Sequence, residues 1–142
     1  MIEGTYFELA IVVGRRDAEG AEHRLACCRD ALERIAGQGV VVPGFATEPC
    51  IVNAVQEEGP GARDWLYLSF EDHGGPARLS ALAERLAAIA AQVFGVAPFE
   101  GALIGAEILG ILPPGWDDGA PEPVESQILL VPGRGGALRR LG

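Results

Sequence analysis

The chain of 142 residues contains no lysine: arginine supplies all 11 of its basic residues, against 20 acidic residues and a formal net charge of −9. A surface with this excess of negative charge repels the phosphate backbone of nucleic acids. The arginines gather only at Arg15 and Arg16 and again at Arg134, Arg139 and Arg140. We therefore expect no nucleic-acid partner. Without a lysine the chain also cannot form a Walker A phosphate loop, whose lysine reaches the terminal phosphates.

The sequence also lacks any apolar run of the roughly 20 residues that a membrane-spanning helix requires. The start of the chain, residues 1–4, has neither the basic nor the apolar region of a signal peptide. We therefore expect a cytoplasmic protein that makes no membrane contact. Apolar residues make up 49% of the chain, which is enough for a folded core. No internal linker divides the sequence, so it predicts a single domain over residues 1–142.

Cysteine is scarce, and its spacing excludes a disulfide framework. The three cysteines are an odd number without a C-x-x-C pair. Cys28 falls on an apolar helical stripe and is expected in the core, whereas Cys50 is a candidate reactive thiol although no base adjoins it in sequence. The two histidines, His23 and His73, lack the spacing of a metal site. The sequence thus predicts no metal and no cofactor.

Alternating strand-like and helical patterns follow one another along the chain. Residues 6–13 alternate between two largely apolar faces, which predicts a central strand that ends at Gly14. Helical spacing of apolar residues predicts two helices, one over residues 18–36 with Asp17 as its N-cap and one that begins near Pro76 and ends at Gly95. Further strands are expected at residues 50–55, 65–70, 102–112 and 127–131.

This order, βαββαβ over about residues 5–112, resembles the ferredoxin-like α/β sandwich. The resemblance concerns topology only, because no family motif lies within the segment. It implies a two-layer α+β fold in which two helices cover one face of a mostly antiparallel sheet. An additional C-terminal strand, residues 127–131, is expected at one edge of the sheet, and residues 134–142 are expected to form a mobile tail. Since this fold supports many functions, it does not indicate one.

Catalytic candidates are few and isolated. His73 follows a predicted strand and precedes a helix, where it could act as a general base oriented by Asp72. The alternative is that this segment is a structural turn with acidic caps. Cys50 and Tyr67 are further catalytic candidates, and Glu8 and Tyr6 belong to the same hypothesis of a small enzyme with a pocket on the sheet face or in a dimer cleft.

The proline-rich loop over residues 116–123 supplies the candidate binding residues Trp116, Asp117, Asp118 and Glu122. Trp116 either packs over the core or anchors an interface, and the sequence leaves both roles open. The acidic residues beside it either meet a basic partner or form a solvated loop. Their spacing is not that of a calcium-binding loop.

Taken together, these features favour a non-enzymatic protein-binding module whose acidic surface meets a basic partner. An immunity protein or an antitoxin-like inhibitor fits this description, because opposite charge steers such pairs together. The small ferredoxin-like enzyme remains the alternative. A homodimer is a further hypothesis, formed through the sheet or through the alanine-rich face of the second helix, Ala87, Ala88 and Ala91.

Overall fold

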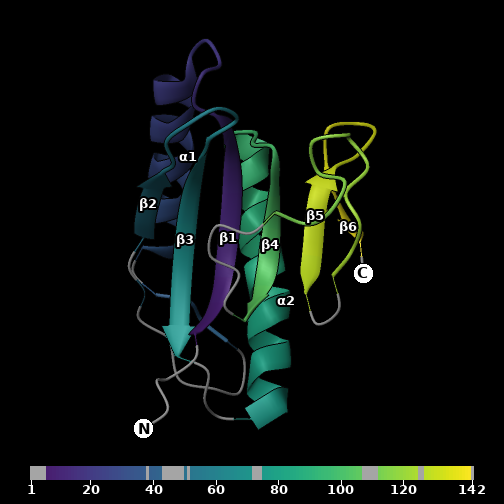
Figure 1. Cartoon of the computed structure of the whole chain (residues 1–142). Helices are drawn as coiled ribbons and strands as arrows, with labels where there is room; N and C mark the ends of the chain where they lie inside the picture. Colours follow the sequence, from purple (N-terminus) through teal and green to yellow (C-terminus); the bar gives the residue numbers. More distant parts are fainter. Residues whose placement is uncertain are drawn as a thin grey trace, which may run out of the picture.

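The computed structural model describes residues 6–37, 39–42, 50, 52–71, 75–106, 112–124 and 127–141. These residues form an α+β protein with two helices and a six-stranded antiparallel sheet (Figure 1). The elements are β1 (Tyr6–Arg15), α1 (Ala21–Ala36), β2 (Val52–Gln56), β3 (Arg63–Glu71), α2 (Gly75–Val96), β4 (Gly101–Ala106), β5 (Ile128–Pro132) and β6 (Leu138–Leu141). Across the sheet the strand order is β2-β3-β1-β4-β5-β6. The predicted α+β class, with two helices and an antiparallel sheet, is confirmed.

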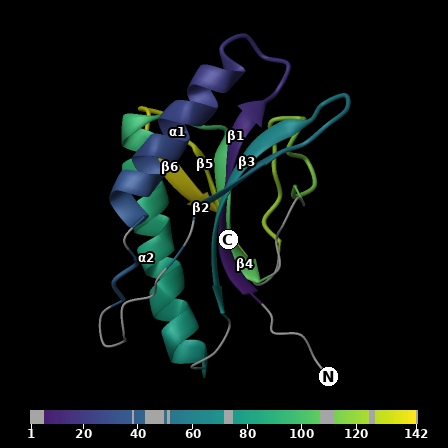
Figure 2. The same cartoon turned by 90° about the vertical axis from the view of Figure 1, so that its left-hand side faces the viewer.

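The alternation in β1 determines the two faces of the sheet. Leu9, Ile11 and Val13 point toward the helices and join the larger core cluster, together with residues of both α1 and α2. Ala10 and Val12 point to the opposite face and belong to a second cluster. Figure 2 shows both helices on one side of the sheet. As the sequence predicts, β1 is a central strand, because β3 and β4 pair with it on either side.

The strand β1 continues past Gly14, so the expectation that it ends there is wrong. Its pairing with β3 shifts between Val12 and Gly14, which marks a β-bulge, and then resumes through Arg15. At Gly14 the chain lies against the side chain of Arg24. A Cβ atom on it would lie 2.3 Å from Arg24 Nη2, so the guanidinium group of α1 occupies the space that a side chain would fill.

Helix α1 begins later than the sequence predicts. Gly20, in the left-handed region with φ of 77°, occupies its N-cap position, and no side chain caps the helix. Asp17, the expected cap, instead pairs with Arg15 at 2.8 Å. The difference arises because glycine adopts this backbone conformation without a steric penalty.

Helix α2 is the core helix of the fold. Within the described part of the chain it is the one helix long and apolar enough, at 22 residues, to cross a membrane by length and composition. Its apolar stripe, which includes Leu82, Leu86 and Ile89, is buried against the sheet. A buried stripe of this kind is typical of a helix that packs in a globular core.

The C-terminal region contributes two strands where the sequence predicts one strand and a mobile tail. β6 pairs with β5 along residues 138–141, and Gly135 and Gly136, with φ of 86° and 81°, form the turn between them. Leu138 packs against the larger core cluster, and Arg140 Nη1 lies 2.8 Å from Glu84 Oε2 on α2. These contacts bring the end of the chain to α2, although Ala88 and Ala91 remain exposed.

Candidate functional site

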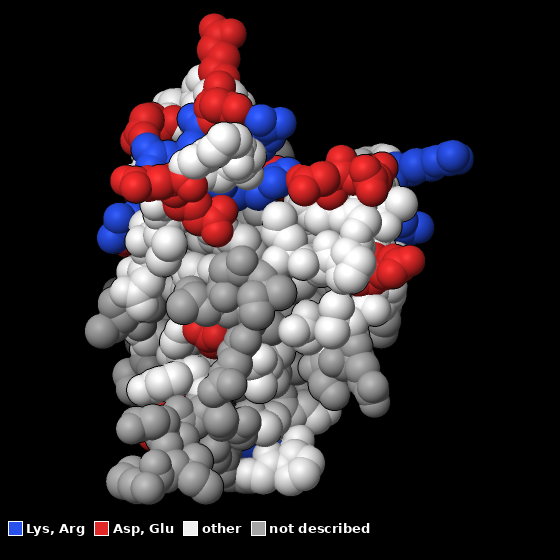
Figure 3. Space-filling view, in the orientation of Figure 1, with Lys and Arg blue, Asp and Glu red and all other residues white. Residues whose placement is uncertain are grey.

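Charged side chains concentrate at one end of the sheet, where β1 ends and β3 and β4 begin (Figure 3). We call this region the charged end. Its ionisable residues are Arg15, Arg16, Asp17, Glu19, Glu22, Arg24, Glu57, Glu58, Arg63, Asp64, Glu100, Asp117 and Asp118. Nine carboxyl groups and four guanidinium groups give it more than half of the formal net charge of −9.

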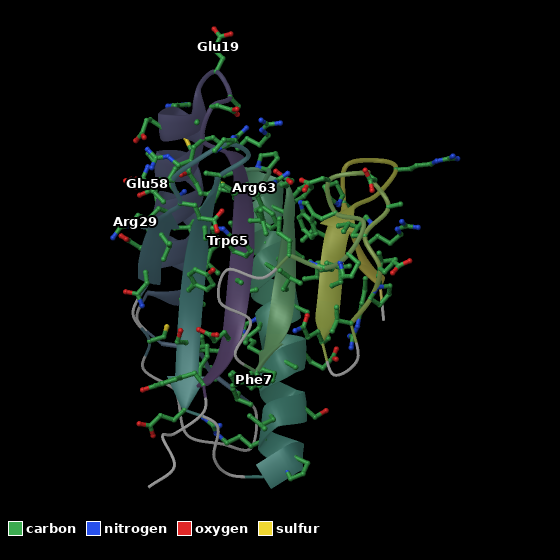
Figure 4. All side chains as sticks on the ribbon, viewed as in Figure 1. Phe7, Glu19, Arg29, Glu58, Arg63 and Trp65 are labelled. Atoms are coloured by element: carbon green, nitrogen blue, oxygen red, sulfur yellow. The ribbon has the colours of Figure 1, made fainter. Side chains whose placement is uncertain are left out.

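Arg63 organises the inner part of the charged end. Its Nε lies 3.0 Å from Glu100 Oε1, and its Nη2 lies 2.7 Å from Asp117 Oδ1. The side chain of Arg63 is only 10% exposed, so these pairs are screened less by solvent than ordinary surface pairs. Trp116 Nε1 donates a hydrogen bond to the same oxygen of Glu100. One guanidinium group, that of Arg63 labelled in Figure 4, therefore joins β3, the residue before β4 and the loop before β5.

Asp64 is the buried acid of this end, with a side chain 1% exposed. Its Oδ1 lies 3.5 Å from Arg16 Nε, and neither carboxyl oxygen makes a hydrogen bond within the described residues. Burial raises the pKa of the Asp64 carboxyl group, and the positive charge of Arg16 opposes this shift. Asp64 is thus a buried group of the fold that pairs with Arg16, rather than an exposed binding group.

The outer part of the charged end includes carboxylates without partners. No described residue pairs with the carboxylates of Glu19, Glu58 and Asp118, or with that of Glu122, which lies outside the charged end on the same loop as Asp118. Glu19 projects from the tip of the molecule in Figure 4. Between residues 16–17 and the β2–β3 turn lies an open hollow of about 300 Å³, which Arg16, Asp17, Glu57 and Glu58 line. Because Asp17 pairs with Arg15 and Glu57 accepts a hydrogen bond from the backbone of Arg63, Glu58 is the carboxylate of this hollow that is available to a cation from outside.

Of the four predicted binding residues, three are accessible and one is not. Asp117, Asp118 and Glu122 are exposed, although Asp117 already pairs with Arg63. Trp116 is 8% exposed and belongs to the second core cluster. Of the two roles that the sequence left open for Trp116, the structure shows packing over the core.

Arg63, Asp64 and Glu100 were not predicted from the sequence as members of this end. Arg63 and Asp64 are charged residues directly before the apolar run of β3, and both are buried. Charged residues directly before a strand usually belong to solvated turns, so the sequence did not indicate that Arg63 and Asp64 are buried. Their burial depends on contacts with residues far away in the chain.

The predicted catalytic residues do not converge in the described structure. Asp72 and His73 lie outside the described residues. Cys50 Sγ donates a hydrogen bond to the carbonyl oxygen of Ala36 at 2.9 Å, and burial raises the pKa of its thiol. Cys50 packs against the core on the helix side, whereas Tyr67 belongs to the cluster on the opposite face. The described residues contain no group of three metal-ligating side chains.

A second polar feature lies on the sheet face opposite the helices. Glu8 in β1 is 7% exposed, and Ser69 Oγ in β3 donates a hydrogen bond to Glu8 Oε2 at 2.9 Å. Across the sheet Glu8 faces Gly105 of β4. On the same face Tyr67 stacks on Trp65, with ring centroids 5.7 Å apart. Burial of a carboxyl group on an otherwise apolar face requires polar partners, which Ser69 provides.

The described structure therefore offers two candidate sites: the charged end, with its unpaired outer carboxylates, and the buried Glu8 on the sheet face. The carboxylates of the first site are exposed to solvent, whereas the Glu8 side chain of the second is buried. Comparisons of the chain with protein-family models, with curated proteins and with solved structures find no match.

Proposed function

We propose that the protein is a cytoplasmic protein-binding module that engages a basic partner through its charged end. The observation that carries this proposal is that a buried arginine holds the loops of the charged end in place while carboxylates on its surface remain unpaired. Buried Arg63 fixes the loops through Glu100 and Asp117, while Glu58 and Asp118 stay exposed with no described partner. Carboxylates on loops that are already fixed lose little conformational entropy when they bind.

The sign and position of the charge favour association with a cationic surface. More than half of the net charge of −9 lies at one end of the molecule, so the field there is stronger than an even distribution would give. Such a field steers an oppositely charged protein toward the site and raises its association rate. A single guanidinium or ammonium group of the partner fits the hollow between residues 16–17 and the β2–β3 turn.

An immunity protein or antitoxin-like inhibitor is the class that we propose. The topology supports, in addition, a ferredoxin-like sandwich as the fold. The elements follow in the order β1, α1, β2, β3, α2 and β4, and the four strands lie side by side as β2-β3-β1-β4, all antiparallel. In this proposal β5 and β6 form a hairpin that extends the edge at β4.

Isothermal titration calorimetry with the basic proteins encoded beside this chain's gene tests the proposal. We expect a 1:1 complex whose affinity falls by at least about tenfold between 50 and 300 mM salt, because exposed charge pairs are screened over about one Debye length. If none of those proteins binds at 50 mM salt, or if binding is insensitive to salt, the proposed function is wrong.

A small enzyme with its site on the sheet face is the second candidate, and the burial of Glu8 favours it. Ser69 holds one oxygen of this carboxylate on the face where Tyr67 also lies. A positioned carboxylate of this kind is suited to general base chemistry. Glu8→Gln keeps the shape of the side chain and removes the base. If the chain has a hydrolytic or proton-transfer activity that Glu8→Gln leaves intact, the sheet-face site is excluded.

A further inference from the structure

Helix α1 presents a histidine and a cysteine side by side on its exposed flank. His23 Nε2 and Cys27 Sγ lie 3.5 Å apart, one helical turn from each other, and both residues are exposed. Residues at positions i and i+4 project from the same face of a helix, so both side chains are presented to the same approaching group. Imidazole and thiolate are the two ligand types that zinc prefers in proteins.

The spacing of the two atoms agrees with that of two ligands on one zinc ion. With a Zn–S bond of about 2.3 Å and a Zn–N bond of about 2.0–2.1 Å, a tetrahedral angle places the sulfur and nitrogen about 3.5 Å apart. The distance between His23 Nε2 and Cys27 Sγ, which are in hydrogen-bond contact, is 3.5 Å. We propose that His23 and Cys27 form half of a zinc site, which a second copy of this chain completes with the same two residues.

A second copy is needed because the described part of one chain contains no group of three metal-ligating side chains. Two-fold symmetry supplies two histidines and two cysteines, the closed tetrahedral set of a structural zinc site. If the exposed flanks of two antiparallel α1 helices cross midway between positions 23 and 27, His23 of each copy faces Cys27 of the other. Ala26, the exposed residue beside the pair, is small enough to allow a close approach.

The coordination chemistry adds no net charge to the interface between the two acidic chains, so the metal–ligand bonds must outweigh the repulsion between them. Each Cys27 thiol gives its proton to solvent as the sulfur binds, and each His23 binds through the Nε2 lone pair while Nδ1 keeps its proton. The ion then carries two positive charges into the interface, which the two thiolates balance. Asp30 and Arg34, one and two turns further along α1, already pair with each other at 3.1 Å and bring no unpaired charge.

Titration of the reduced, metal-free and tag-free chain with Zn²⁺ or Co²⁺ tests this inference. We expect one ion per two chains, a rise in mass from 14.9 kDa to about twice that value by light scattering, and the sulfur-to-metal absorption of tetrahedral Co²⁺. His23→Ala and Cys27→Ser should each abolish the stoichiometric binding and the dimer, while the matched controls His73→Ala and Cys50→Ser keep both.

Three results would overturn the inference: no stoichiometric metal binding at micromolar concentration, one ion bound per monomer, or binding that survives in both ligand variants. Circular dichroism of each variant separates the loss of metal binding from a loss of folding, since both positions are exposed and should tolerate substitution. The test is independent of the proposed function, because it requires no basic partner and measures metal and mass only.

Discussion

Trp116 lies so close to Gly101 that a Cβ atom on the glycine would be 2.3 Å from Trp116 Cη2. The indole ring therefore rests on bare backbone at the start of β4. From there its Nε1 donates to Glu100, while the next residue, Asp117, pairs with Arg63. These contacts hold the loop before β5 against the sheet and keep its carboxylates at the charged end.

Gly101→Ala should destabilise the fold by about 1–3 kcal/mol, because the new methyl group overlaps the indole ring and also meets the carbonyl oxygen of Leu130 at 3.0 Å. Urea unfolding followed by tryptophan fluorescence measures the change. The matched control is Gly95→Ala in α2, where nothing lies within 4 Å of the added atom. This control should gain up to about 1 kcal/mol in helix propensity. Equal effects of the two substitutions would show that Trp116 does not pack as described.

Arg63→Gln should lower the free energy of unfolding by about 2 kcal/mol, because Glu100 and Asp117 lose a largely buried cation. Arg29→Gln is the control, since Arg29 forms a single exposed pair with Glu33 at 3.0 Å. Such a pair contributes about 0.3–0.5 kcal/mol. Thermal and urea unfolding give the free energy of unfolding of both variants. If Arg63→Gln lowers it no more than Arg29→Gln does, Arg63 does not organise the charged end.

Periodicity was sufficient to predict the fold class and most of the elements. The alternation of Leu9 and Ile11 with Ala10 and Val12 gave the central strand, and the leucine stripe of α2 gave the helix that packs on it. β6 was not predicted, because its short Leu-Arg-Arg-Leu pattern resembles an exposed tail. Its stability depends on pairing with β5 and on the contact of Arg140 with Glu84, which no local pattern encodes.

The candidate site was only partly predictable, for a related reason. The acidic loop at Asp117 and Asp118 stands out by composition, but its anchor, Arg63, is 54 residues before Asp117 in the chain. Trp116 can pack over the core because Gly101 has no side chain there. From the sequence alone, a glycine at the start of a strand does not indicate that a tryptophan packs on it. The His23–Cys27 pair has helical spacing, yet its significance depends on the distance between Nε2 and Sγ in the structure.

Asp64 should make the stability of the protein depend on pH in a direction unusual for a carboxyl group. Burial raises its pKa in the folded state, so the folded chain holds this proton more tightly than the unfolded chain. The contribution to stability is present below the ordinary pKa of 3.8 and is lost as pH rises through the higher, folded value.

Asp64→Asn removes this titration. The stability of the variant relative to the unmodified chain should therefore rise as pH increases from 3 upward, as measured by thermal unfolding in a pH series. The other carboxyl groups are the same in both proteins, so their effect on stability cancels when the stability of one protein is subtracted from that of the other at each pH. If the variant instead loses relative stability toward neutral pH, the ion pair of Asp64 with Arg16 outweighs its burial.

The two neighbouring cysteines of α1 should differ in their reaction with iodoacetamide. Burial raises the pKa of the Cys28 thiol to about 11, and its Sγ donates to the carbonyl oxygen of Ala97 at 3.4 Å. Since the thiolate is the reactive form, Cys28 should react at least about 100-fold more slowly at pH 8 than an ordinary exposed thiol. Cys27 is exposed and should react first. Peptide mass spectrometry resolves the two sites, and rapid labelling of Cys28 in the folded chain would contradict its burial.

Charge reversal at Glu58 and Asp118 tests the role of the charged end most directly. Neither residue has a described partner, so Glu58→Lys with Asp118→Lys should leave the fold intact. The control is Asp30→Lys with Glu33→Lys, which changes the net charge equally on the outer flank of α1. We predict that calorimetry with the basic partner shows at least about tenfold weaker binding for the first variant and less than about twofold for the control. Equal losses in the two variants would show that net charge alone, and not the charged end, governs binding.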